Sequence, residues 1–342
     1  MSAELLITTR GDLTETIRRG HAAVADTSGR LIAFAGDPDA VSYMRSSAKP
    51  LQATMLIQSG AAERFGISGR LLAVCCASHH GEPEHVEAVR EVLGRAGIAE
   101  SALQCGIHAP IHEPSAAALW RAGGTPSEIH NNCSGKHAGM LASSRALGAP
   151  LETYLSIDHP VQKGILSNVA SLTGVPRHRI VLGTDGCSVP VHGVPVRAMA
   201  LAYARLAQPS SVPAFADPLA EISEAMSAFP WYVSGTDSGD SLLMERLAGR
   251  VVAKGGAEGV LCVAVRDAGI GLAIKMESGR NDHAHAVAIE MLRQLGLLST
   301  REVEALGDLV SPPVYNHRRL LVGEVRPTVQ LSRVDSEAHA DA

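Results

Sequence analysis

Two short antiparallel hairpins near opposite ends of the chain constrain its fold most strongly. In HAAVADTSGRLIAFAGD, two strand-like runs flank residues 26–29, whose composition (DTSG) suits a hairpin turn. The run VLCVAVRDAGIGLAIKM repeats this pattern around residues 267–269. Because helical patterns fill the sequence between them, the terminal regions are expected to meet in one sheet. The expected fold class is α/β of the α+β kind, with a mixed or antiparallel sheet from N- and C-terminal strands, flanked by helices, and a helical subdomain.

The expected helices lie between and after the hairpins, at residues 50–65, 82–96, 134–147, 160–174, 197–208, 217–228, 239–248 and 281–295. The stretch LQATMLIQSG is apolar almost all round, so the first of these helices is expected to be buried. No Gly/Ser-rich or Pro-rich linker divides the chain. We therefore expect a single domain over 1–332, with its sheet from 1–45 and 250–332 and its helical and mixed part from 46–249. Residues 333–342 are expected to form a flexible tail.

Charge and hydropathy exclude several classes of protein. Of 342 residues, 46% are hydrophobic and 19% charged, which is ordinary for a globular protein. A formal net charge of -5 argues against a nucleic-acid partner. No window approaches the roughly 18 uninterrupted apolar residues of a membrane helix, and the N-terminus lacks a signal pattern. A cytoplasmic location is expected, and six cysteines are too few for a disulfide framework, so they are core residues or ligands.

The stretch RSSAKP, at the start of the first expected helix, contains an S-x-x-K arrangement. Ser46 and Lys49 stand three residues apart, so in a helical turn they share a face and the amine can take the hydroxyl proton. Lysine serves as a base only when burial or positive neighbours lower its pKa, and Arg45 is such a neighbour. The alternative is a capping serine followed by an exposed lysine.

Two further polar residues stand at junctions where an apolar run ends. Ser78 follows LLAVCCA and precedes the helix that opens at EPEHV, and such junctions tend to line clefts. Its alternative role is an N-cap with solvent-facing histidines beside it. Lys254 ends a strand-like run and precedes Gly255 and Gly256, which let other backbone or a substrate come close. It is a candidate second base or carboxylate binder, or else a solubilising charge on an edge strand.

The runs NNCSGKHAGM and TDGCSVP contain a candidate metal site. Cys133 shares a helical face with Lys136 or His137, and Cys187 follows a strand in a Gly-containing loop. Two thiolates and one nitrogen donor satisfy the three protein positions of an open tetrahedral zinc site. Chemistry alone favours His137 as the third ligand, because lysine must lose a proton to coordinate. Buried apolar cysteines are the alternative.

Five motifs in order, RSSAKP, CASHHGEPEHV, NNCSGKHAGM, TDGCSVPVHGVP and AKGGAEGV, resemble the asparaginase II family of the rhizobial type. The resemblance runs from about residue 5 to about residue 330. It implies a fold similar to the serine β-lactamases and glutaminases, a catalytic role for the domain over 1–332, and a homodimer. It also implies the hydrolysis of L-asparagine, a small-molecule substrate, to aspartate and ammonia.

The resemblance assigns roles to individual residues. It makes Ser46 with Lys49, and Ser78 with Lys254, two serine-lysine pairs, either of which is a candidate for forming the acyl-enzyme. It selects Lys136 over His137 as the third zinc ligand, and so implies zinc as cofactor. The residues expected to act in catalysis are Ser46, Lys49, Ser78 and Lys254. Those expected to bind substrate are Arg45, Lys136, His137 and Asp185. Those expected to bind the metal are Cys133, Lys136 and Cys187.

Two alternatives from the same residues stay open. An S-x-x-K hydrolase of the glutaminase or β-lactamase kind would apply the same chemistry to another substrate. A non-enzymatic, zinc-dependent binding protein for small ligands would need the metal set but no serine-lysine pair. Whether zinc is catalytic or only positions the substrate is open as well.

Overall fold

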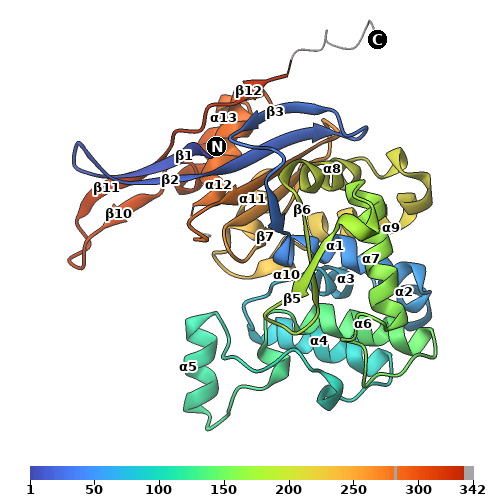
Figure 1. Cartoon of the computed structure of the whole chain (residues 1–342). Helices are drawn as coiled ribbons and strands as arrows, with labels where there is room; N and C mark the ends of the chain where they lie inside the picture. Colours follow the sequence, from blue (N-terminus) through green and yellow to red (C-terminus); the bar gives the residue numbers. More distant parts are fainter. Residues whose placement is uncertain (281–282, 335–342) are drawn as a thin grey trace, which may run out of the picture.

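The computed structural model describes residues 1–280 and 283–334, and its main sheet is assembled from the two ends of the chain (Figure 1). Its strands run in the order β10-β11-β1-β2-β9-β8-β7, with β3 beside β2 and β12 beside β3, and every pairing is antiparallel. The bounds are β1 Ala3–Arg10, β2 Leu13–Asp26, β3 Leu31–Ala35, β7 Val251–Gly256, β8 Val260–Val265, β9 Ile270–Met276, β10 Pro313–Tyr315, β11 Leu321–Pro327 and β12 Ser332–Arg333.

Both predicted hairpins are present, and they join each other directly. β2 and β3 flank the first turn, β8 and β9 flank the second, and β2 pairs with β9 over residues 20–26 and 270–276. β8 is buried along its whole length, so helices cover both faces of the sheet there. Helix α8 (Val196–Ala207) comes so close that a Cβ on Gly271 would lie 2.0 Å from the Ala200 carbonyl oxygen. The predicted fold class is confirmed.

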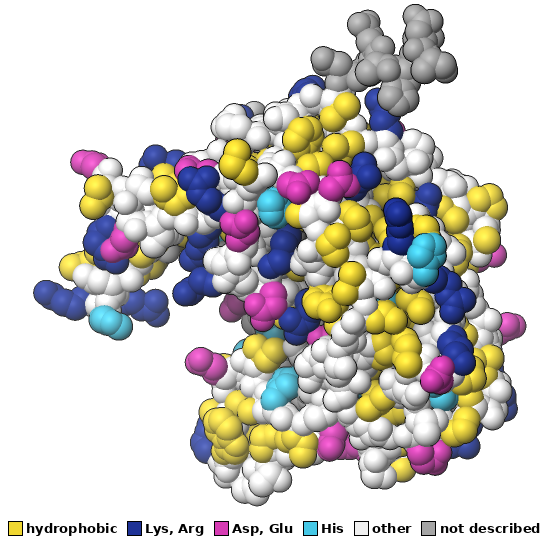
Figure 2. Space-filling model, in the orientation of Figure 1, with side chains coloured by type: hydrophobic (Ala, Val, Ile, Leu, Met, Phe, Trp, Pro, Cys, Tyr) yellow, Lys and Arg dark blue, Asp and Glu magenta, His cyan; other side chains and the backbone are white. Residues whose placement is uncertain are grey.

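The far halves of β1 and β2, together with β10 and β11, extend away from the body as an arm (Figure 1). Lys and Arg side chains gather near its end (Figure 2). Beyond β1, on the same side of β2, Ser332 and Arg333 pair with β3 as β12, and Arg333 is the first residue of the stretch expected to be a flexible tail. The remainder of that expected tail, from residue 335 onward, lies outside the described residues.

A smaller antiparallel sheet, ordered β4-β6-β5, connects the main sheet to the helical part. It contains β4 (Val41–Tyr43), β5 (Val181–Thr184) and β6 (Pro190–Pro195). The stretch Val41–Tyr43 thus pairs with β6 and leaves the main sheet before residue 45.

The helices agree with most of the predicted ranges. Their bounds are α1 Lys49–Gln58, α2 Ala61–Phe65, α3 Arg70–Cys75, α4 Pro83–Arg95, α5 Glu113–Arg121, α6 Ser134–Ala146, α7 Pro160–Thr173, α9 Ala216–Ala228, α10 Pro230–Ser234, α11 Gly239–Arg246, α12 Ala284–Gln294 and α13 Thr300–Leu306. The range predicted as one helix over 50–65 is two, because Gly60 adopts a left-handed φ of 73° between them. The first two residues of the range predicted as 281–295 lie outside the described residues. Among residues 1–280 and 283–334, no helix has the length and apolar character needed to cross a membrane.

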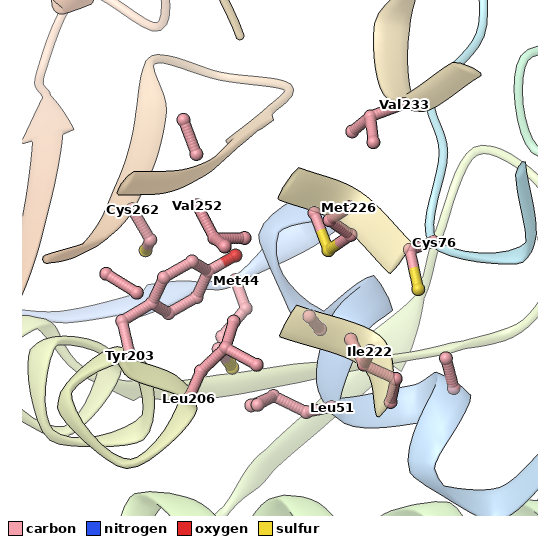
Figure 3. Packing of buried hydrophobic residues seen from close by; sticks show 14 of the residues in the cluster. Met44, Leu51, Cys76, Tyr203, Leu206, Ile222, Met226, Val233, Val252 and Cys262 are labelled. Carbon is pink, nitrogen blue, oxygen red and sulfur yellow. The ribbon is translucent and has the colours of Figure 1, made fainter. Parts of the chain in front are cut away.

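The apolar core lies directly beneath the turn that precedes α1 (Figure 3). Met44 and Leu51 pack there with residues of α8, α9 and the sheet, and Tyr203 donates a hydrogen bond at 2.8 Å to the Ser47 carbonyl. Gly256 lets β7 approach the same turn, since a Cβ there would lie 2.7 Å from the Met44 carbonyl oxygen. Packing between sheet and helices therefore fixes the position of the turn that carries Ser46 and Lys49.

Candidate active site

The 3₁₀ turn Arg45–Ala48 leads directly into α1, whose first residue is Lys49. Arg45 has a left-handed φ of 51°, unusual for a residue with a side chain, and Pro50 occupies the first turn, where a missing N–H costs little. The Lys49 side chain is buried and directed into the protein. Burial lowers its pKa, and the charges of Lys136 and Lys254 act in the same direction, while the Cys133 thiolate opposes them.

Ser78 lies in the loop between α3 and α4, where the amine of Lys49 reaches it. Lys49 Nζ donates to Ser78 Oγ at 2.9 Å and also to the Ala77 carbonyl. The loop is held on the other side by His79, whose Nε2 lies 2.8 Å from the hydroxyl of Ser134 at the start of α6. Ser78 is thus fixed against the lysine by contacts with two helices.

The pairing differs from the expected one. In the described part of the chain, no hydrogen bond joins the Ser46 hydroxyl to the Lys49 amine or the Ser78 hydroxyl to the Lys254 amine. The Lys49 amine bonds instead to the Ser78 hydroxyl, and only the Lys49 backbone N–H bonds to Ser46, at its carbonyl. The expectation for Ser46 assumed that both residues share one helical face. In the structure Ser46 belongs to the 3₁₀ turn before α1, and the long Lys49 side chain extends toward the α3–α4 loop.

Lys254, on β7, is almost completely buried and forms an ion pair with Asp240. Its Nζ donates to Asp240 Oδ2 at 3.1 Å and to the Gly255 carbonyl at 2.8 Å. The interpretation of Lys254 as a solubilising charge on an edge strand is therefore wrong. Its amine faces the carboxylate that α11 contributes, and β7 is paired with β8.

Ser46, Ser78 and Lys254 line one open cavity of about 370 Å³. His80, Asn132, Ser234, Asp240 and His285 are among its other polar lining residues. The expected serines and the second lysine are thus brought together from the turn before α1, the α3–α4 loop and β7. A volume of this size suits a small polar molecule.

The predicted sulfur and nitrogen donors also meet. Lys136 Nζ lies 2.9 Å from Cys187 Sγ, and the Cys187 thiol hydrogen-bonds to Cys133. That hydrogen bond lowers the pKa of Cys133, and the positive charges of Lys49 and Lys136 outweigh the opposing effect of burial. Burial acts to lower the pKa of Lys136, but the two sulfurs outweigh it and raise that pKa. Lys49 therefore links this cluster to Ser78.

Three of the residues expected to bind substrate lie near this cluster: His137, Arg45 and Asp185. His137 lies with Nδ1 2.7 Å from the Tyr154 hydroxyl, and its buried Nε2 has no hydrogen-bond partner among the described residues. Arg45 donates from Nε to Asp185 Oδ1 at 2.8 Å. Burial acts to raise the pKa of Asp185, but Lys136, the Gly186 N–H and Arg45 outweigh it and lower that pKa.

Four of the residues that line the cavity are not indicated by any pattern in the sequence: Asn132, Ser234, Asp240 and His285. Asp240 accepts from Lys254, the Gly255 N–H, Ser234 and His285. Nothing in SGDSLL sets this aspartate apart from an ordinary acidic residue in the first turn of a helix. Only the packing of α11 against β7 brings it to Lys254.

A buried amine held against a serine hydroxyl at the wall of a cavity is the arrangement expected of a hydrolase that uses a serine nucleophile. The model of the family described as L-asparaginase II matches residues 6–327. The chain therefore belongs to the L-asparaginase II family, and by class it is a hydrolase that acts on amides.

Solved structures with a similar fold include three enzymes. A β-lactamase from Mycobacterium bovis is 14% identical, with 80% of this chain and 94% of that chain covered and a TM-score of 0.43. A Bacillus glutaminase is 15% identical, with coverages of 81% and 91% and a TM-score of 0.40. Simvastatin synthase from Aspergillus terreus is 13% identical, with coverages of 84% and 90% and a TM-score of 0.42. A search of curated protein sequences finds no match.

Proposed function

We propose that the protein is an L-asparaginase that hydrolyses L-asparagine to L-aspartate and ammonia, with Ser78 as nucleophile and Lys49 as its base. The observation that carries the proposal is the 2.9 Å contact between Lys49 Nζ and Ser78 Oγ at a cavity of substrate size. Burial favours the neutral amine of Lys49, which is the form that can accept a proton. Family membership supplies the amide substrate class.

In the proposed reaction Lys49 takes the proton of Ser78 as Oγ attacks the side-chain amide carbon. The tetrahedral intermediate then collapses, the carbon–nitrogen bond breaks, and the departing nitrogen takes the proton from Lys49 to leave as ammonia. A water molecule then gives a proton to the same amine and attacks the carbonyl carbon of the aspartyl ester. The bond between that carbon and Ser78 Oγ breaks, Oγ takes the proton back from Lys49, and aspartate is released. Ser46, on the same cavity wall, is the alternative nucleophile. Arg45 and Asp185 are proposed to bind the charged α-groups of the substrate.

We further propose zinc as the cofactor, held by Cys133, Lys136 and Cys187. Supporting this, two sulfurs and one amine lie in contact, and thiolate sulfur is a ligand that zinc prefers. The Lys136 amine would have to lose its proton to the metal in order to coordinate. In the described part of the chain, no group of three or more His, Cys, Asp or Glu side chains is placed to hold a metal, so the Lys136 amine is needed as a donor. Bound there, zinc would supply a positive charge that fixes the Cys187 loop against α6.

One assay set tests the function. With the unaltered protein, ammonia release is measured from L-asparagine and from L-glutamine. Hydrolysis of a β-lactam is followed by the opening of its ring. L-Asparagine is expected to have the highest kcat/KM. Mass spectrometry after rapid quenching is expected to find the aspartyl ester on Ser78 and not on Ser46. Hydrolysis confined to the other two substrates, or no hydrolysis at all, contradicts the proposal.

Zinc is tested by metal analysis of the purified protein. We expect one zinc per chain, lost in Cys187→Ser, while Cys262→Ser, on β8, retains it. Equal zinc content in the two variants contradicts the site. The homodimer and the cytoplasmic location stay predictions, and light scattering tests the first by comparing the mass in solution with that of the chain.

A further inference from the structure

Asp240 connects the segments that form one wall of the cavity. Its Oδ2 accepts from Lys254 Nζ at 3.1 Å, from the Gly255 N–H at 2.7 Å and from Ser234 Oγ at 3.2 Å. Its Oδ1 accepts from His285 Nε2 at 2.9 Å. The carboxylate thereby joins α10, α11, β7 and α12, and a carboxylate with this many donors is held strongly in its ionised form.

The Asp240 carboxylate is held in its ionised form. Burial acts to raise the pKa of Asp240, but the Lys254 charge and the His285 hydrogen bond outweigh it and hold that pKa well below its usual range. The side chains of Lys254 and Asp240 are only 2% and 6% exposed, so little water screens their attraction. The ion pair at 3.1 Å places this carboxylate directly beside the Lys254 amine.

The geometry of Lys254 leaves one donor for a ligand. An ammonium has three N–H groups. Asp240 and the Gly255 carbonyl accept from two, and within residues 1–280 and 283–334 no side chain or carbonyl accepts from the third. Lys254 lines the cavity, as Ser78 does.

The backbone N–H of Ser78 is not available as such a donor. In many serine hydrolases the N–H of the nucleophile helps to bind the negative charge that develops on the substrate carbonyl oxygen. Here the Ser78 N–H already donates to the Val233 carbonyl at 2.9 Å. This N–H is therefore already engaged, which leaves the role of oxyanion donor open to another group on the cavity wall.

We propose that Lys254 is this group. Asp240 and His285 position the Lys254 ammonium so that its remaining N–H stabilises the oxyanion. Lys254 is then not the base of either serine. The inference rests on the proposed function, with Ser78 as the nucleophile. In this role Lys254 is a catalytic residue beside Ser78 and Lys49, because its N–H would contact the reacting oxygen. Asp240 and His285 act through Lys254 and are positioning residues.

The first test compares Lys254→Arg with Lys254→Met, using ammonia release from L-asparagine. Arginine remains cationic at every working pH and cannot serve as a base. Removal of one oxyanion donor typically lowers kcat by about 10² to 10³. We expect that loss in Lys254→Met with KM changed less than about threefold, and at least tenfold higher kcat in Lys254→Arg. Equal, near-zero activity in both variants overturns the inference.

The second test uses Asp240→Asn, which removes the counter-charge with little change of shape. In the variant the buried neutral amine of Lys254 becomes favoured, so kcat is expected to gain a descending limb at alkaline pH that the unaltered protein lacks. If Lys254 were a base, the same change would increase kcat at neutral pH with no such limb. Other ionisable groups near Lys254, which must be considered in fitting the profiles, are Lys49, Cys76, His80, Cys262 and His285.

His285→Asn tests the positioning role at a less buried site. Its effect is expected as a several-fold decrease in kcat at unchanged KM, and a change in KM alone contradicts that role. Circular dichroism and thermal unfolding establish that each variant is folded, and an unfolded Asp240→Asn leaves the two Lys254 variants to decide. An unaltered protein that releases no ammonia overturns the proposed function and the inference with it. An active protein in which Lys254→Arg equals Lys254→Met overturns the inference alone.

Discussion

Replacement of Lys49 by methionine should separate catalysis from stability. Methionine has a similar length but no amine, so it removes the 2.9 Å contact with Ser78 Oγ and the bond to the Ala77 carbonyl. A general base contributes about 10² to 10⁴ in rate, equivalent to about 3 to 5 kcal/mol of activation free energy. We expect kcat for ammonia release from L-asparagine to decrease by that factor.

The expected change in stability is much smaller. Leaving the buried Ala77 carbonyl without its donor costs about 1 to 3 kcal/mol. Against this, the variant no longer buries an amine, and replacing buried charged groups by apolar ones of similar volume is often neutral or stabilising. The free energy of unfolding, measured by urea denaturation, should therefore change by less than about 2 kcal/mol.

Lys163→Met is the matched control. Lys163 lies on α7 with its side chain 55% exposed, so this variant should keep both kcat and stability. A folded Lys49→Met protein with kcat within tenfold of the unaltered protein refutes the role of Lys49 as base. An equal loss of kcat in the control would mean that the assay responds to something other than this amine.

Three further outcomes are expected. Gly256→Ala should reduce both thermal stability and kcat, because its Cβ would lie 2.7 Å from the Met44 carbonyl oxygen and push β7 away from the turn that carries Ser46. An unchanged melting temperature contradicts this. Burial lowers the pKa of His85 to about 4, below the unfolded value near 6.5. The unfolded chain therefore binds a proton first as the pH falls from 6.5 toward 4, and the free energy of unfolding decreases by about 2 kcal/mol by pH 5. His85→Phe should accordingly reduce the difference in unfolding free energy between pH 7 and pH 5, and an undiminished difference contradicts the assignment. Removal of zinc by a chelator should lower the melting temperature of the unaltered protein but not that of Cys187→Ser, and equal shifts in the two proteins contradict a metal at this site.

Local patterns in the sequence predicted the secondary structure well where one period dominated. The hairpins at 26–29 and 267–269 and the amphipathic helix α4 follow from turn residues and from three-and-four spacing. Helices α3, α5, α10 and α13 were missed, because short segments contain too few turns for a period to be recognised. The range 50–65 was predicted as one helix, and Gly60 divides it.

Sequence alone also pointed to groups that the structure brings together: Ser46, Lys49, Ser78 and Lys254 line or approach one cavity, and Cys133, Lys136 and Cys187 form one cluster. It did not point to Asp240 or His285 in the same cavity. Only the tertiary structure decided the partners, because it places the Lys49 amine against the Ser78 hydroxyl and the Asp240 carboxylate against the Lys254 amine. Sequence spacing defines neighbours along a helix face, whereas a long side chain meets whatever the packing of other segments brings within its reach. The contact between residues 49 and 78, and that between 240 and 254, are set by how α1, α3, α11 and β7 pack around one core.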